Sequence, residues 1–107
     1  MKQFTTPEQT VKMIELELLP KHIQKISDDG KLLLECVGYS VGELIEILPK
    51  VVEDEDSEYA TISIYHDTIS WVIDYQSPER CFYSTSNIEL VDALYEMIIK
   101  LKNEKLI

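Results

Sequence analysis

Residues 59–75 read YATISIYHDTISWVIDY, with apolar side chains at alternate positions on both sides of a polar centre. A period of two is typical of β-strands that bury one face, because successive side chains of a strand point to opposite sides. The polar centre His66-Asp67-Thr68 carries turn-forming residues. The stretch therefore predicts an antiparallel hairpin with strands at 59–65 and 69–75.

The same alternation limits which residues of the two strands can pair. Ile62 must share a face with Trp71, and directly paired residues share a face. An even-numbered residue of the first strand therefore pairs with an odd-numbered residue of the second, so the numbers of two paired residues sum to an odd number. The loop that connects the strands must then have an even number of residues. A two-residue turn at His66-Asp67 or at Asp67-Thr68 satisfies this condition. Because a slip by one residue would move Trp71 to the polar face, we expect a firmly defined register.

Three segments begin with a Ser or Thr that is followed three residues later by Glu or Gln, namely Thr6 to Gln9, Ser40 to Glu43 and Ser86 to Glu89. This pattern is a capping box, in which side chains satisfy the unpaired amides at a helix start. The strongest helical periodicity follows Ser86 and predicts a helix over 87–102. Residues 21–38 allow either a second helical stretch or a hairpin, and extended structure at 31–37 is favoured.

Together these segments predict an α+β fold in a single domain, residues 1–107. Its sheet is a three-stranded antiparallel β-meander (59–65, 69–75 and 80–84), with amphipathic helices packed on one face. We expect Trp71 in the core, against the apolar stripe of the last helix.

The chain carries 20 acidic and 10 basic residues, and the resulting net charge of −10 is unevenly placed. Residues 51–99 hold eleven acids and one base, Arg80, which equals the whole net charge. Direct binding to nucleic acid is disfavoured, because the phosphates would be repelled. A basic protein is the expected partner. No apolar run approaches the roughly 20 residues of a membrane span, so we expect a cytoplasmic protein with no membrane contact.

The expected polar face of the sheet and the acidic run that precedes it supply the candidate partner-binding residues. Tyrosines among small polar residues are typical of recognition surfaces, although they are also good strand formers. The acidic run is equally compatible with a solvated loop. The candidate residues are Glu53, Asp54, Glu55, Asp56, Tyr59, Tyr65 and Asp74.

No motif for catalysis, metal binding or cofactor binding stands out, so we expect no enzyme activity, no metal and no cofactor. Cys81 and His66 would form a nucleophile pair only if they met, and a cysteine within a strand is usually a small buried residue. Asp54, Asp56 and Glu58 lack the spacing and the glycine of an EF-hand calcium loop.

Three blocks of the sequence resemble a known group of proteins. They are KQFTTPEQT (2–10), YSVGELIEILP (39–49) and ELVDALYEM (89–97). The blocks resemble short uncharacterised proteins of Bacteroides-type gut bacteria and of their mobile elements or phages. The resemblance implies a bacterial or phage accessory protein and brings no activity with it.

The sequence thus favours a non-enzymatic interaction module with an acidic binding surface, either a nucleic-acid mimic or an accessory regulator. Two alternatives stay open. One is a small metal-dependent regulator or enzyme that uses the acidic loop 53–58. The other is a homo-oligomer built on the tyrosine-rich face or on a free strand edge.

Overall fold

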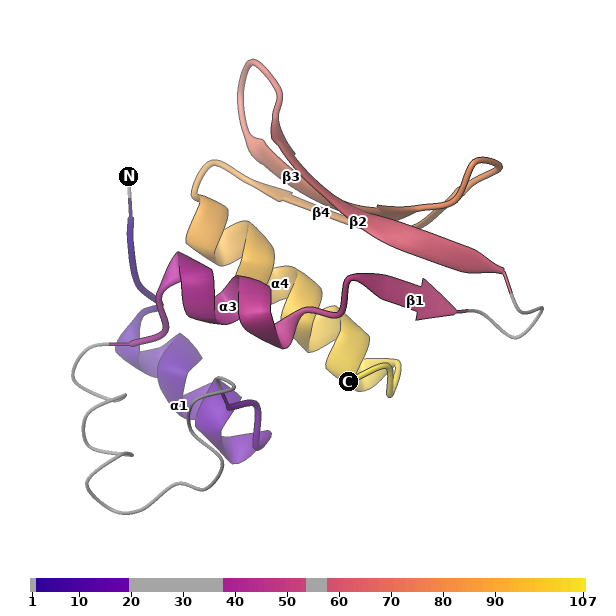
Figure 1. Ribbon diagram of the computed structural model, residues 1–107. Helices are drawn as coiled ribbons and strands as arrows, with labels where there is room; N and C mark the ends of the chain where they lie inside the picture. Colours follow the sequence, from indigo (N-terminus) through magenta and orange to yellow (C-terminus); the bar gives the residue numbers. More distant parts are fainter. Residues whose placement is uncertain (1, 20–37, 54–57) are drawn as a thin grey trace.

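The computed structural model describes residues 2–19, 38–53 and 58–107 (Figure 1). The segment 31–37, for which extended structure was expected, lies outside the described residues, so that prediction stays open. The elements follow in the order α1 (Pro7–Glu15), α3 (Val41–Ile47), β1 (Val51–Glu53), β2 (Tyr59–His66), β3 (Trp71–Gln76), β4 (Cys81–Asn87) and α4 (Leu90–Asn103).

The described strands form one antiparallel sheet in the order β1-β2-β3-β4, which confirms the α+β class. The sheet has four strands rather than the predicted three. The additional strand is β1, which pairs Val51 with Thr61 and Glu53 with Tyr59. Its three residues are too few for an alternation of side chains to be recognised in the sequence.

The register of the central hairpin follows the predicted parity, but the turn lies further along the chain. Ile64 pairs with Ile73, and the paired numbers sum to an odd value as expected. The predicted turn positions are wrong, because the Asp67 N–H donates to the Ser70 carbonyl oxygen and Thr68-Ile69 forms the tip. The Asp67 carboxylate accepts the backbone N–H groups of Ile69 (2.7 Å) and Ser70 (2.6 Å), and this local bonding stabilises the later turn.

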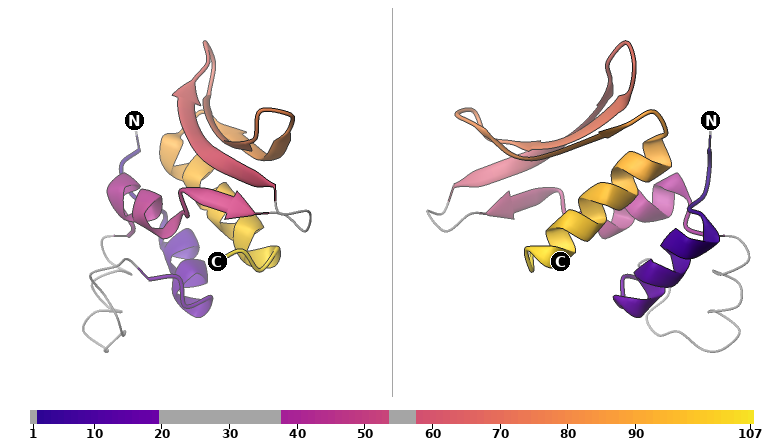
Figure 2. Two further views of the ribbon diagram at one scale, coloured as in Figure 1. Left: turned by 45° about the vertical axis from the view of Figure 1, so that its right-hand side comes forward. Right: turned by 180° about the vertical axis from the view of Figure 1, so that it is seen from behind.

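The helices cover one face of the sheet, and α4 lies directly beneath β3 and β4 (Figures 1 and 2). The core between them contains Ile73 and Tyr75 of β3 and Leu94 and Ile98 of α4, all fully buried. The sheet bends away from the helices at both of its hairpin tips, so the tips project beyond the helical layer.

Trp71 packs against the core as predicted, but it is only half-buried, so it lies at the margin of the core rather than at its centre. The later turn makes Trp71 the first residue of β3, where it pairs with Asn87, ahead of the start of α4 at Leu90. Its indole packs edge-on against the imidazole of His66, with ring centroids 5.0 Å apart. The centre of the helix-facing side belongs instead to Ile73 and Tyr75.

Two of the three predicted capping boxes are confirmed. Thr6 and Gln9 form one at α1, and Ser40 and Glu43 form the other at α3. The third prediction is wrong, because Ser86 lies in β4 opposite Val72. Here α4 begins at Leu90 after an N-cap residue, Glu89, that makes no side-chain cap. The Asn87 side-chain oxygen instead accepts the Glu89 N–H at 3.1 Å.

Candidate functional site

The face of the sheet opposite the helices is not covered by any described element (Figures 1 and 2). The register places polar and aromatic side chains there, because directly paired residues share a face. Ser63 pairs with Asp74, which pairs with Ser84, and Tyr65 pairs with Val72. We call this surface the open face. It comprises Tyr59, Thr61, Ser63, Tyr65, Val72, Asp74, Gln76, Ser84 and Ser86.

Asp74 lies at the centre of the open face and is 3% exposed. Its carboxylate accepts hydrogen bonds from the Tyr65 hydroxyl (2.9 Å), the Gln76 side-chain amide (2.7 Å) and the Ser84 hydroxyl. Buried carboxylates need such donors, because burial without them is costly. Asp74, which was predicted as a contact residue, therefore lies beneath the surface and holds the side chains of Tyr65, Gln76 and Ser84 in place.

Tyr59 and Tyr65, which the sequence predicts as contact residues, are both accessible on the open face. Their side chains are 59% and 44% exposed, and both are large apolar surfaces. The hydrogen bond to Asp74 raises the pKa of the Tyr65 hydroxyl and fixes the direction of its ring. A ring that is held in place loses little conformational entropy when a partner packs on it.

The acidic run is only partly within the described residues. Glu53 is exposed at the end of β1 and pairs with Tyr59, so it borders the open face. Residues 54–56 lie outside the described ranges, so their contribution stays a prediction. Glu58 binds the Ser77 hydroxyl at 2.6 Å and the Arg80 guanidinium at 3.3 Å. The guanidinium of Arg80 also stacks on the ring of Phe82, 4.2 Å from its centroid.

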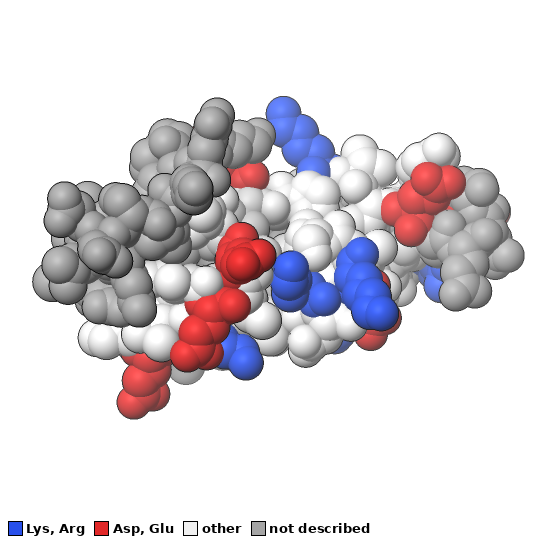
Figure 3. Space-filling view, turned by 90° about the horizontal axis from the view of Figure 1, so that it is seen from below, with Lys and Arg blue, Asp and Glu red and all other residues white. Residues whose placement is uncertain are grey.

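The helical side of the molecule carries charges of both signs. Seen from that side, basic and acidic side chains lie side by side over the described surface (Figure 3). Lys100 and Lys102 occupy the last turn of α4, whereas Glu8 occupies the first turn of α1. Among the described residues, this side therefore does not present a field of one sign.

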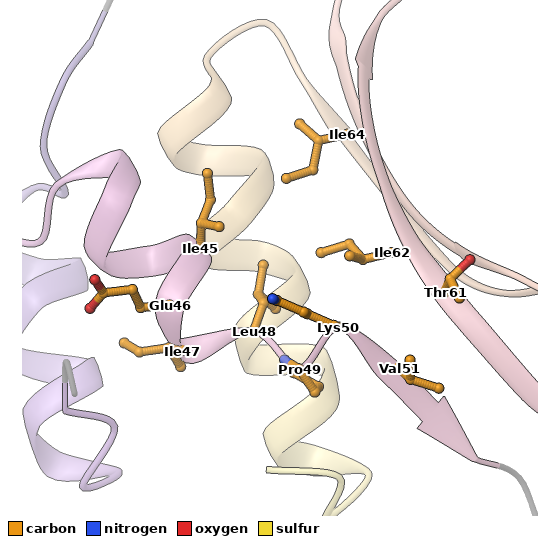
Figure 4. A pocket seen from close by; sticks show the side chains of 10 residues that line it. All are labelled: Ile45, Glu46, Ile47, Leu48, Pro49, Lys50, Val51, Thr61, Ile62 and Ile64. Atoms are coloured by element: carbon orange, nitrogen blue, oxygen red, sulfur yellow. The ribbon is translucent and has the colours of Figure 1, made fainter.

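A groove that the sequence analysis did not predict lies between α3 and the start of the sheet (Figure 4). Its volume is about 1010 Å³, and its lining is mostly apolar. The side chains of Ile45, Ile62 and Ile64 point into it. The groove lies beside the part of β2 that β1 does not pair with, a position that no local sequence pattern reveals.

The structure separates the two residues of the possible nucleophile pair. His66 pairs with Trp71 near one end of the sheet, whereas Cys81 pairs with Gln76 near the other. Trp71 and Gln76 are five positions apart along β3, which corresponds to roughly 17 Å. Cys81 is also exposed at the first position of β4, so the expectation of a buried cysteine is wrong.

Within residues 2–19, 38–53 and 58–107, no cluster of three His, Cys, Asp or Glu side chains is placed to hold a metal ion. In the same ranges, no helix has the length and apolar character that a bilayer span requires.

Comparison with known proteins adds no relative: the chain matches no protein-family model, no curated protein and no solved structure. The resemblance to short proteins of Bacteroides-type bacteria therefore stays a prediction.

Proposed function

We propose that the protein is a non-enzymatic interaction module that binds a basic partner protein through the open face and the acidic residues beside it. The observation that carries the proposal is the coincidence of two features in one half of the chain. Residues 51–99 carry a net charge equal to that of the whole chain, and the strands of the uncovered sheet face, with its two accessible tyrosines, lie within the same range.

Charge and aromatic rings have different roles in this proposal. The acidic surplus attracts Lys- and Arg-rich surfaces over a distance and speeds association. Tyr59 and Tyr65 supply contact area, and their rings also attract cations. The partner is therefore a protein with exposed Lys or Arg side chains. Such a module acts as a nucleic-acid mimic where that partner is a DNA-binding protein, and as an accessory regulator otherwise.

The experiment measures association and dissociation rates by stopped flow with a fluorescent peptide, Lys-Ser-Lys-Ser-Lys-Ser-Lys. The test variant neutralises the acidic run through Glu53→Gln, Asp54→Asn, Glu55→Gln and Asp56→Asn. We expect slower association and little change in stability, because exposed like charges contribute little to folding. Tyr65→Ala should instead speed dissociation, because it removes a contact.

A matched control neutralises the same number of exposed acids outside residues 51–99, at Glu8, Glu15, Glu17 and Glu104. The proposal predicts that the control slows association less than the test variant does. Equal slowing by the two variants would mean that only the total charge matters, and the assignment of the binding surface would be wrong.

A further inference from the structure

The edge of β2 beside the groove carries unpaired backbone groups. The Ile62 N–H donates to the Lys50 carbonyl oxygen at 3.1 Å, and β1 pairs only with the first part of β2. Backbone groups of successive residues alternate between the two edges of a strand. The N–H and C=O groups of Ile64 and His66 therefore point to the same edge as those of Ile62. In the part of the chain that the structure describes, they have no backbone partner there.

The groove lies directly below this edge, on the helical side of the sheet (Figure 4). Ile62 and Ile64 form its wall on β2, and Ile45 forms its wall on α3. Ile45 is 41% exposed although it is a large apolar side chain. One further strand would pair with the free backbone groups of β2 and would cover the apolar groove below them.

An extended segment fits these features better than a helix or a small molecule. A helix satisfies its own backbone groups and would leave those of Ile64 and His66 unpaired. An added strand pairs with the edge through its backbone and places every second side chain in the groove. Its other side chains emerge on the open face, next to Tyr65.

The charges around the edge favour a basic occupant. Glu46 lines the groove and is exposed, and Asp67 lies at the tip of the β2–β3 hairpin. Hydrogen bonds from the backbone of Ser70 and Ile69 hold the pKa of Asp67 below its usual value, so the tip is negative at neutral pH. Lys50 also lines the groove and offsets the charge of Glu46, so the preference for a basic occupant comes from Asp67 and from the acidic surplus of residues 51–99. A second copy of the chain would bring another net charge of −10, which disfavours self-pairing.

We infer that the free edge of β2 at Ile64 and His66 binds an extended segment of the basic partner, in which apolar residues alternate with Lys or Arg. The apolar side chains of this segment enter the groove between α3 and β2, and its cationic side chains lie on the open face. The inference rests on the proposed function, because it takes the basic partner from it.

Two peptides of identical composition separate this geometry from plain charge attraction. They are Lys-Val-Lys-Val-Lys-Val-Lys, which alternates, and Lys-Lys-Lys-Lys-Val-Val-Val, which does not. We expect the alternating peptide to bind about tenfold more tightly by fluorescence anisotropy, because burying one valine side chain is worth at least that factor. Its binding should also slow hydrogen exchange at the amides of Ile64 and His66, as observed by NMR.

A pair of variants tests the groove. Ile45→Gln removes its apolar wall on α3 and should weaken binding of the alternating peptide about three- to tenfold. Val11→Gln is the matched control, because Val11 is a similarly exposed aliphatic residue (38%) on α1 and does not line the groove. This control should leave binding unchanged. The exchange experiment on the unsubstituted protein needs no variant and stands if Ile45→Gln fails to fold.

The outcomes distinguish this inference from the proposed function. Equal binding of both peptides, with no slowed exchange at Ile64 and His66, would overturn the inference and leave the proposed function standing. The absence of binding by either peptide at low salt would overturn both. Slowed exchange that appears without peptide and grows with protein concentration would assign the edge to a second copy, which would also overturn the inference.

Discussion

At the scale of single residues, Gly38 and Tyr39 join α3 to the segment that precedes α1. The Thr5 N–H donates to the Tyr39 carbonyl oxygen at 3.0 Å, and the Tyr39 N–H donates to the Thr5 hydroxyl at 2.9 Å. Gly38 has φ +82°, and a Cβ atom there would lie 2.6 Å from the Thr5 carbonyl oxygen. This position therefore requires glycine for both conformational and steric reasons.

Gly38→Ala should lower the free energy of unfolding by about 1–3 kcal/mol, because it forces a side chain into this conformation and this contact. Gly42→Ala is the control, since a Cβ atom at this helical position has no neighbour closer than the Ser40 hydroxyl at 4.0 Å. The control should be neutral or stabilising by up to about 1 kcal/mol. Urea unfolding measures both, and equal effects would contradict the close approach at Thr5.

Two buried tyrosines should make stability depend on alkaline pH. Burial, together with the nearby charge of Glu43, raises the pKa of Tyr39 to about 12, and its hydroxyl donates to the Leu18 carbonyl oxygen at 2.7 Å. Burial also raises the pKa of Tyr75, whose hydroxyl donates to the Pro49 carbonyl oxygen.

The sign of this dependence follows from proton linkage. In the unfolded chain these hydroxyls ionise near pH 10, below their folded pKa values. Their contribution is therefore complete below about pH 10 and is lost as the pH rises towards about 12. The free energy of unfolding should fall between about pH 10 and about pH 12, and Tyr39→Phe should reduce the fall. A free energy that stays constant over this range would contradict the burial of both hydroxyls.

At the scale of elements, the helix starts differ in what holds them. Ser40→Ala should cost about 0.5–2 kcal/mol, because the Ser40 hydroxyl accepts the Glu43 N–H at the start of α3. Ser86→Ala should cost less than about 0.5 kcal/mol, since its side chain lies on the open face of β4 and caps nothing. Thermal or urea unfolding measures the loss of stability in the two variants. Equal losses would indicate that Ser86 caps a helix after all.

The strand β3 should show a gradient of stability effects along its helix-facing side. Ile73→Ala should cost about 2–5 kcal/mol, because Ile73 is fully buried against α4. Trp71→Ala should cost less, about 1–3 kcal/mol, because Trp71 is half-buried beside the hairpin tip. Urea unfolding compares the two, and Ile69→Ala at the exposed tip is a control that should change little. A larger loss from Trp71→Ala would place the indole in the core after all.

The elements that the sequence predicts are those whose signal is local. Alternation over residues 59–75 predicts the hairpin and the parity of its register, and two side-chain caps predict the starts of α1 and α3. The turn position depends on the Asp67 carboxylate, which accepts the backbone N–H groups of Ile69 and Ser70. Ser86 belongs to a strand because β4 runs longer than its apolar pattern. The open face follows from the alternation, whereas the groove and the free edge depend on how far β1 extends.

At the scale of the whole molecule, the fold divides the surface into two sides. One side consists of helices with charges of both signs, and the other is an uncovered sheet whose four strands all lie within the acidic half of the chain. The free edge of β2 lies where these sides meet, above the groove. A basic segment at this edge would contact both the apolar space and the open face.

The proposed function depends above all on the attraction between a basic partner and the acidic half of the chain. The most direct test is the association rate of the peptide Lys-Ser-Lys-Ser-Lys-Ser-Lys across a salt series, since screening reaches about 8 Å at physiological ionic strength. The account predicts that this rate falls steadily as salt rises, while the dissociation rate changes little. An association rate that is independent of salt would contradict it.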